Sequence, residues 1–166
     1  MAVVADAVAE FVLANVTGAD TDAVMRSVEA YVAELEALDA EVAETLAAIP
    51  SDQRILVTNH SVFGYFADRY NFEVIGAVLP GGSTANGADA QRLVELAETI
   101  EHEGVPAIFA DSSSSDELAQ TLAAEVGDVS VVELFSESLG GEGSDGSSYI
   151  AMLGANARRI ADALAN

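Results

Sequence analysis

The chain has 166 residues, and its six basic side chains, all arginine, stand against 28 acidic ones, which gives a formal net charge of −22. A nucleic acid or an anionic bilayer would be repelled by such a surface, because binding to either requires Lys or Arg to displace counterions. Apolar residues make up 51% of the chain and charged residues only 20%. This balance predicts a compact domain with a real core, not a disordered acidic tail, and no nucleic-acid partner.

Several other classes are excluded or disfavoured by composition. The longest stretch without a charged residue, 74–88, contains Pro80 and a Gly-Gly pair, so we expect no direct membrane span. The absence of cysteine removes disulfides, thiolate metal sites and cysteine nucleophiles. The first residues have neither a basic region nor an apolar stretch, so the given chain carries no recognisable secretory signal, and taken alone they predict a cytosolic protein.

The first 50 residues are predicted to be helical. Apolar residues at Val4, Val8, Phe11 and Val12 share one helical face, and this pattern ends near residues 17–18. A longer helix is predicted from Asp20 or Thr21 to Pro50, about 28 residues and about 42 Å long. It is either an ordinary amphipathic surface helix or a spacer between two lobes, and its periodicity fits both.

After Pro50 the pattern changes to short β-branched runs that alternate with helices. Strands are predicted at 55–58, 72–78, 107–110 and 129–134, and helices at 62–70, 88–103, 116–126 and 148–165. Four such units in a row predict an α/β fold: a four-stranded parallel sheet with helices on both faces, preceded by the long helix. The expected domain boundaries are 1–50 for the helical segment and 51–166 for the α/β lobe.

Polar side chains follow each predicted strand. The four segments are 59–61, 81–84, 111–113 and 136–138, and they contain one imidazole, His60, and the carboxylates of Asp111 and Glu137. Because the carboxyl ends of parallel strands meet at one edge of a sheet, we expect these groups to share that edge.

Composition leaves the roles of these residues open. His60 is either a solvated or capping residue or a metal ligand or general base. Glu137 is a metal ligand, a general acid or base, or a solvated loop charge. His102 is predicted to be a surface group near a helix C-terminus. Asp111, the serines at 112–115 and Asp116 resemble a helix start in which a Ser or an Asp caps exposed amides, and capping is favoured over catalysis.

Familiar catalytic and nucleotide-binding patterns are missing. The turn Gly81-Gly82-Ser83-Thr84 lacks the spacing of a dinucleotide fingerprint or a phosphate-binding loop. No Gly-x-Ser-x-Gly sequence occurs, and no spacing of His, Ser and Asp favours a hydrolase triad.

Several segments, read in order, resemble one family. Residues 58–66, Thr-Asn-His-Ser-Val-Phe-Gly-Tyr-Phe, are similar to Thr-x-His-Asp-Ala-Phe-Gly-Tyr-Phe, and residues 79–85 to a Gly-x-Ser-Thr turn. Residues 105–113 resemble Val-Pro-x-Ile-Phe-x-Glu-Ser-Ser, and residues 134–140 resemble Leu-Phe-Ser/Thr-Asp-Ser-Leu-Gly. Tyr149, Met152 and Asn156 resemble Tyr-x-x-Met-x-x-Asn, with one more residue between Met152 and Asn156 than in that motif. These motifs resemble those of the metal-ion solute-binding proteins of ABC importers, which capture zinc or manganese outside the membrane.

The resemblance implies an architecture and a ligand set. Proteins of this family have two α/β lobes joined by one long rigid helix, and the metal lies between the lobes with two ligands from each. Residues 20–49 resemble that helix, and the part after Pro50 resembles the second, C-terminal lobe. His60 and Glu137 would be the third and fourth ligands. Two ligands of one ion should bring an imidazole nitrogen and a carboxylate oxygen within about 3 to 5 Å of each other.

The sequence departs from the family in three positions of the site and in its extent. Glu137 replaces the usual aspartate, Ser61 replaces the acid after the histidine, and Asp111 replaces the usual glutamate, which leaves Asp111 as a capping or supporting group. The first lobe, with its two histidine ligands and the signal or lipid anchor, would lie upstream. The resemblance therefore implies an extracytoplasmic protein, periplasmic or at the cell surface, in place of a cytosolic one.

The function expected from these residues is capture of Zn(II), with Mn(II) as the alternative, and delivery to an ABC permease. An imidazole in the third position favours zinc. The partners would be the missing N-terminal lobe and the permease, with no enzymatic activity and with weak metal binding by this chain alone. A small flavodoxin-like enzyme or regulatory domain, with Asp111 or Glu137 as its acid, is the alternative, and a purely structural domain is a third.

Overall fold

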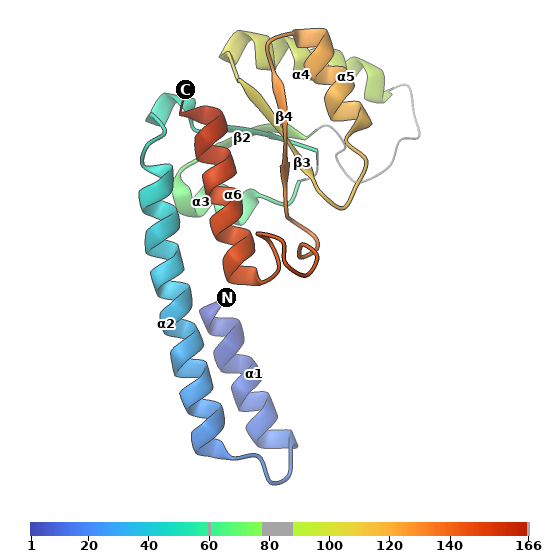
Figure 1. Ribbon diagram of the computed structural model, residues 1–166. Helices are drawn as coiled ribbons and strands as arrows, with labels where there is room; N and C mark the ends of the chain where they lie inside the picture. The colour runs from blue at the N-terminus through green and yellow to red at the C-terminus, as the bar shows by residue number, and fades with distance from the viewer. Residues whose placement is uncertain (60, 78–87, 166) are drawn as a thin grey trace. The chain divides into compact units, whose positions relative to one another are not determined.

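The computed structural model describes residues 1–59, 61–77 and 88–165, without the side chains of residues 77 and 88–90 (Figure 1). These residues form two compact units, Met1–Ala43 and Glu44–Asn166. The first unit contains helix α1 (Ala2–Asn15) and most of helix α2 (Thr21–Leu46). The second contains the end of α2 and the whole α/β part.

The two predicted N-terminal helices are confirmed. Asp20 caps α2, since its carboxylate accepts a hydrogen bond from the amide of Ala23 at 3.0 Å. With 26 residues, α2 is a long helix, as predicted, although it ends at Leu46 and not at Pro50. The chain leaves the helix through a turn in which the amide of Ile49 donates to the carbonyl of Leu46, and a short 3₁₀ helix, η1 (Ser51–Gln53), follows.

The predicted four-stranded parallel sheet is also confirmed. Its strands are β1 (Ile55–Thr58), β2 (Glu73–Ala77), β3 (Ala107–Asp111) and β4 (Ser130–Leu134), in the order β2-β1-β3-β4. All three pairings are parallel. The α/β fold with a preceding long helix is therefore correct, and the predicted Val78 end of the second strand lies outside the described residues.

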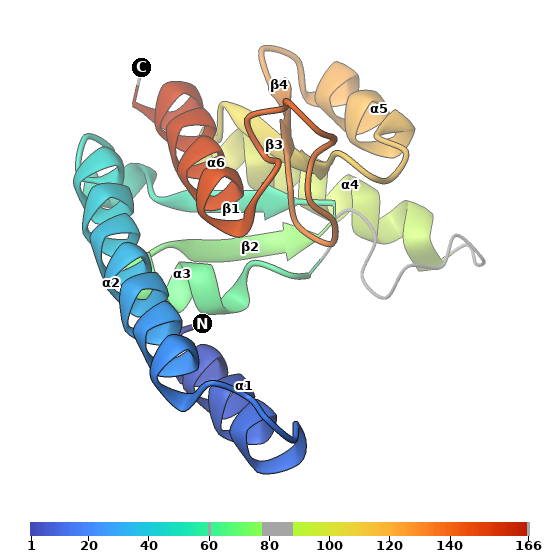
Figure 2. The same cartoon turned by 60° about the horizontal axis from the view of Figure 1, so that its bottom comes forward.

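The connecting helices cover both faces of the sheet. They are α3 (Gly64–Tyr70), α4 (Ala88–Glu103) and α5 (Glu117–Val126), and the C-terminal helix is α6 (Tyr149–Leu164). Figures 1 and 2 show α3 and α6 on one side of the sheet and α4 and α5 on the other. This is the arrangement that right-handed crossovers produce when the chain moves from β1 to β2 in one direction and then to β3 and β4 in the other.

The change of direction creates a topological switch point between β1 and β3. The connection after β1 runs to α3 on one face, and the connection after β3 runs to α5 on the opposite face. In open parallel sheets, ligands bind in the crevice outside the carboxyl ends of the strands at such a point. Here the segments that follow these two strands contain residues 59–61 and 111–115.

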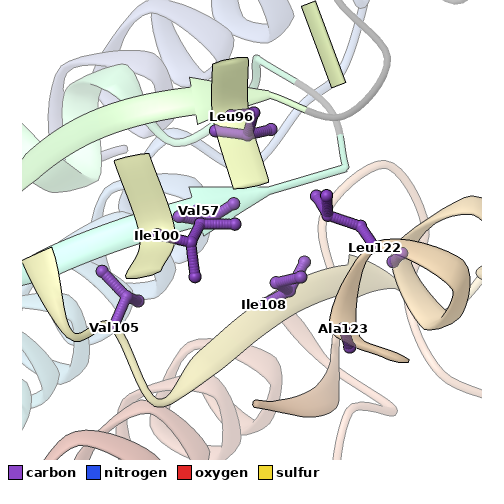
Figure 3. Close-up of a cluster of buried hydrophobic side chains, with 8 residues drawn as sticks. Val57, Leu96, Ile100, Val105, Ile108, Leu122 and Ala123 are labelled. Carbon is purple, nitrogen blue, oxygen red and sulfur yellow. The ribbon is translucent and has the colours of Figure 1, made fainter. Parts of the chain in front are cut away.

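A core of buried aliphatic side chains holds α4 and α5 against the sheet. Val57 and Ile108 project from the central strands toward Leu96 and Ile100 of α4 and Leu122 of α5 (Figure 3). The approach of α4 to β2 is close, because a Cβ at Gly76 would lie 2.5 Å from Leu96 Cδ1. The absence of a side chain at Gly76 therefore lets the helix sit on the sheet.

Arg54 ties together three chain segments at the opposite end of the sheet. Its guanidinium donates hydrogen bonds to the carbonyls of Leu46, Ile49 and Tyr70 at 3.1, 3.2 and 3.1 Å. Leu46 and Tyr70 end α2 and α3, where the regular hydrogen bonding of a helix stops and carbonyls take other donors. The planar guanidinium presents separate, fixed donors to all three acceptors.

Helix boundaries differ from the prediction by a few residues. Helix α3 begins at Gly64 and not at Val62, and α5 begins one residue after Asp116. Helix α6 starts after Ser148, whose hydroxyl caps it by accepting from the amide of Ala151 at 3.2 Å. Among the residues that the structure describes, no helix is both long and apolar enough to cross a bilayer.

Candidate functional site

Of the two residues expected to bind metal, the structure describes Glu137 but not His60. Glu137 is exposed, three residues after the end of β4. His60 lies outside the described residues, as does the turn at residues 81–84, so the expected approach of His60 to Glu137 stays a prediction. The neighbour of His60, Asn59, is described and buried at the carboxyl end of β1.

Asp111 lies at the centre of a hydrogen-bond network along the carboxyl edge of the sheet. It ends β3 and is only 3% exposed. Its Oδ1 accepts from the amide of Ser113 at 2.7 Å and from the Ser113 hydroxyl, and its Oδ2 accepts from the Ser136 hydroxyl and, at 3.3 Å, from the amide of Glu137. One carboxylate thus joins the segment after β3 to the segment after β4.

Of the Ser and Asp residues expected to cap this helix start, Asp111 does not cap it, and its contacts agree with the supporting role that the resemblance left open. The first amide of α5, that of Glu117, is 3.4 Å from the hydroxyl of Ser115, and none of the described bonds of Asp111 goes to α5. The sequence suggested a cap because an acid followed by four serines is a common helix start. The actual partners of Asp111 include two residues 25 and 26 positions away, which local spacing cannot reveal.

The environment of Asp111 favours its ionised form. Burial by itself raises the pKa of this carboxyl, but the hydrogen bonds from Ser113 and Ser136 and from the amides of Ser113 and Glu137 outweigh it. The pKa of Asp111 is therefore held below its usual range. A group that keeps its proton off so readily is a poor general acid near neutral pH.

Asn59 extends the same network across the switch point. Its Oδ1 accepts from the amide of Asp111 at 2.9 Å, and its Nδ2 donates to the hydroxyl of Ser114 at 3.0 Å. Its own amide donates to the carbonyl of Phe109 at 2.9 Å, which continues the β1–β3 ladder by one residue. The residue that precedes His60 is therefore fixed by both backbone and side chain.

The segment after β4 is held from the other side by α6. Asn156 is buried, and its side-chain amide pairs with both backbone groups of Phe135: the Phe135 amide donates to Oδ1 at 3.0 Å, and Nδ2 donates to the Phe135 carbonyl at 2.6 Å. This pair of hydrogen bonds replaces those that a neighbouring strand would make with Phe135. The backbone of Phe135, two residues before Glu137, is therefore fixed by a side chain of α6.

The ring of Phe135 organises the glycine-rich loop that follows. A Cβ at Gly146 would lie 2.5 to 2.7 Å from three atoms of this ring, so only glycine allows the loop to pass there. The amide of Gly140 donates to the carbonyl of Gly146 at 2.9 Å, which closes the loop. Arg159 lies over the same ring at 4.7 Å from its centroid and pairs with Asp145 at 2.9 Å. The absence of a side chain at Gly146 therefore allows close packing against Phe135.

Sequence reasoning missed Asn59, Asn156 and Arg159 as supports of this edge. Asn156 could have been identified, because it lies one residue beyond the position of the asparagine in the Tyr-x-x-Met-x-x-Asn motif that this segment resembles. Asn59 and Arg159 had no comparable signal.

Among the described residues, the other acidic and histidine side chains do not gather into a second site. His102 is exposed and lies 3.0 Å from the Glu103 carboxylate, as expected of a surface group. In residues 1–59, 61–77 and 88–165, no three His, Asp or Glu side chains are placed to hold one metal ion.

Known proteins resemble the chain over nearly its whole length. It is 39% identical over 142 residues to the zinc-binding protein TroA of Treponema pallidum, a match that spans 82% of this chain and 46% of that protein. It is 30% identical over 148 residues to the manganese-binding lipoprotein MntA of Bacillus subtilis, which spans 86% of this chain and 48% of that protein. The chain thus spans about half the length of these relatives.

The fold and the family agree with these relatives. The solved structure of the periplasmic zinc-binding protein TroA from Treponema pallidum superposes with a TM-score of 0.87 at 35% identity, covering 97% of this chain and 59% of that one. Residues 1–163 match the family described as "Zinc-uptake complex component A periplasmic". The chain belongs to this family of metal-binding, solute-binding transport proteins.

Proposed function

We propose that this chain is the C-terminal lobe and connecting helix of an extracytoplasmic solute-binding protein that captures Zn(II) and delivers it to an ABC importer. The observation that carries the proposal is the family match over residues 1–163, combined with an exposed acid on a firmly held segment beside the switch point of the sheet. The division into a helical segment, 1–50, and a lobe, 51–166, is part of the proposal.

The proposed ligands from this chain are His60 and Glu137. Both follow strands whose carboxyl ends lie at one edge, and the segments after β1 and β4 are both bonded to Asp111. A neutral imidazole and a carboxylate suit Zn(II), and a water or the opposing lobe would complete the tetrahedron. Relatives are named for zinc and for manganese, and the imidazole is our reason for choosing zinc over Mn(II).

The opposing, N-terminal lobe is the first proposed partner. Helix α1 supports it, because this helix is apolar nearly all round: Ala9 is buried, while Val4, Val8 and Phe11, which share a face, are 51, 56 and 67% exposed. A helix that is apolar on all sides belongs inside a larger structure. The chain spans about half of its relatives, so the remainder of the fold is the natural cover for this face.

The further partner and the location follow from the relatives. Several carry the name of a metal ABC transporter substrate-binding lipoprotein, and the matched family is called periplasmic. We accordingly propose a membrane permease as the recipient of the ion and a periplasmic or cell-surface location for the whole protein.

The alternative of a flavodoxin-like enzyme or regulatory domain is weakened by the state of Asp111, one of its two candidate acids. Asp111 is buried, its carboxylate accepts four hydrogen bonds, and its pKa is lowered. These properties suit a permanent hydrogen-bond acceptor better than a proton donor. We therefore propose a binding role for this edge, without a catalytic step.

Calorimetry with Zn(II) on the 166-residue chain tests the ligand assignment. With two protein ligands and an open site, affinity no better than about micromolar is expected, and His60→Ala or Glu137→Ala should each abolish it. Matched controls are His102→Ala and the exposed acid Glu142→Ala, which should leave the affinity unchanged. Moderate salt should suppress non-specific binding to the acidic surface. Nanomolar affinity that survives both ligand substitutions would place the ligands elsewhere.

A further inference from the structure

Three consecutive residues, Phe135, Ser136 and Glu137, are each held by a buried polar side chain from another element. Asn156 of α6 bonds both backbone groups of Phe135, and Asp111 of β3 bonds the hydroxyl of Ser136 and the amide of Glu137. Asn156 is 4% exposed and Asp111 is 3% exposed. We propose that Asp111 and Asn156 are positioning residues that fix the backbone of Glu137 before the ion arrives. The inference rests on the proposed function, because it takes Glu137 as a metal ligand.

The number of donors around Asp111 indicates that it supports the site and does not bind the ion itself. An ionised carboxylate offers about four acceptor positions on its two oxygens. Four donors occupy them: the amide and hydroxyl of Ser113, the hydroxyl of Ser136 and the amide of Glu137. An ion could reach Asp111 only if some of these bonds broke, whereas the exposed carboxylate of Glu137 is accessible as it stands.

The same network reaches the other proposed ligand segment. Asn59 accepts from the amide of Asp111 and donates to Ser114, so the residue before His60 is bonded to the backbone of the residue that holds Glu137. A displacement of Asp111 would therefore break hydrogen bonds to both proposed ligand segments. This is the role that supporting hydrogen bonds play around metal ligands, where their loss weakens binding about 10- to 100-fold.

A preset backbone reduces the ordering that the ion must otherwise bring about. If residues 135–137 were free, each metal-binding event would have to fix their backbone dihedral angles, at a cost in conformational entropy. Because these residues are already bonded, that cost is met during folding. The side chain of Glu137, one methylene longer than the usual aspartate, then remains the adjustable part.

The test uses a matched pair at Ser136, together with Asp111→Asn. Ser136→Ala removes the hydroxyl that Asp111 accepts from, and Ser136→Thr keeps it. Ser138→Ala, on an exposed residue next to Glu137, is the control. Each variant of the full chain is measured for Zn(II) affinity by calorimetry and, without metal, for hydrogen exchange of the Glu137 amide relative to the Ile108 amide in the core strand.

We expect Asp111→Asn and Ser136→Ala to weaken Zn(II) binding about 10-fold or more and to speed exchange of the Glu137 amide to a similar extent. Ser136→Thr and Ser138→Ala should match the parent chain in both readouts. A merely structural role would change exchange at Ile108 and Glu137 together, which the ratio detects.

Two results would overturn the inference, and they differ from each other. If Glu137→Ala abolishes binding while Asp111→Asn and Ser136→Ala change neither affinity nor exchange, the positioning role is wrong and the proposed function stands. If Glu137→Ala leaves Zn(II) affinity unchanged, the ligand assignment fails and the inference fails with it.

Discussion

Helix α1 and the carboxyl edge of the sheet differ in whether their side chains have partners: the buried polar groups of the edge are hydrogen-bonded, and large apolar side chains of α1 are exposed. At the edge, buried polar groups of Asn59, Asp111 and Asn156 all have partners, and among the described residues no buried side-chain nitrogen or oxygen lacks one. Helix α1 instead leaves Val4, Val8 and Phe11 more than half exposed. The contrast indicates that the buried polar groups of the carboxyl edge are satisfied among the described residues, whereas α1 keeps three large apolar side chains exposed.

Among substitutions at the carboxyl edge of the sheet, Asn156→Leu should lower the free energy of unfolding most. It leaves the amide and carbonyl of the buried Phe135 without their partner, and each unsatisfied group costs about 1–3 kcal/mol. We expect the free energy of unfolding, measured by urea denaturation, to fall by about 3 kcal/mol. Arg158→Ala, at the exposed neighbouring position on α6, should change it by less than about 0.5 kcal/mol. A loss below about 1 kcal/mol in Asn156→Leu would contradict the importance of this pairing.

Gly146→Ala should come next, because its new methyl group would overlap the Phe135 ring at 2.5 Å. Overpacking of this kind costs about 2 kcal/mol, here as a lower midpoint in thermal or urea unfolding. The matched control is Gly141→Ala, since a Cβ there meets nothing within 4 Å and its backbone is not left-handed. Equal stabilities of the two variants would mean that the loop at residues 140–146 moves aside easily and is not held rigidly against Phe135.

Asp111→Asn should have a smaller effect, and one that depends on pH. Because the pKa of Asp111 is lowered in the folded protein, its stabilising contribution is complete above the unfolded pKa of about 3.9 and is lost as the pH falls through the folded value. The difference in unfolding free energy between parent and variant should be about 1.5 kcal/mol at pH 7 and shrink steadily below about pH 4. A difference that grows as the pH falls would contradict the ionised, hydrogen-bonded state of Asp111.

The smallest effect on stability is expected from substitutions on the exposed apolar face of α1. A triple Val4→Ser, Val8→Ser, Phe11→Ser variant changes exposed side chains, so its unfolding free energy should stay within about 1 kcal/mol of the parent. Its association with the part of the Treponema pallidum relative that this chain does not match should weaken at least about 10-fold, because apolar area is lost from the contact. Val94→Ser, on an exposed valine of α4, is the control and should bind like the parent. Unchanged binding by the triple variant would mean that this face is not the contact.

The fold was predictable because its pattern is local. Short β-branched runs located the four strands, and period-3.6 spacing located the helices between them. The predicted boundaries differ by a few residues where caps such as Ser148 decide them. The support of the candidate site was not predictable in the same way. Asp111 meets Ser136 and Glu137, and Phe135 meets Asn156 21 residues away, only because the sheet and α6 bring them together. No spacing rule connects such pairs.

The central claim, that one imidazole and one carboxylate of this chain bind Zn(II), is tested most directly by X-ray absorption at the zinc edge. The sample is the chain loaded with one equivalent of Zn(II) at moderate salt, with His102→Gln introduced so that His60 is its only imidazole. We expect a shell at about 2.0–2.1 Å with the outer scattering of one imidazole ring, and the loss of that scattering when His60→Ala is added. An oxygen-only shell, the same with and without His60, would mean that zinc lies on the acidic surface and that this edge is not the metal site.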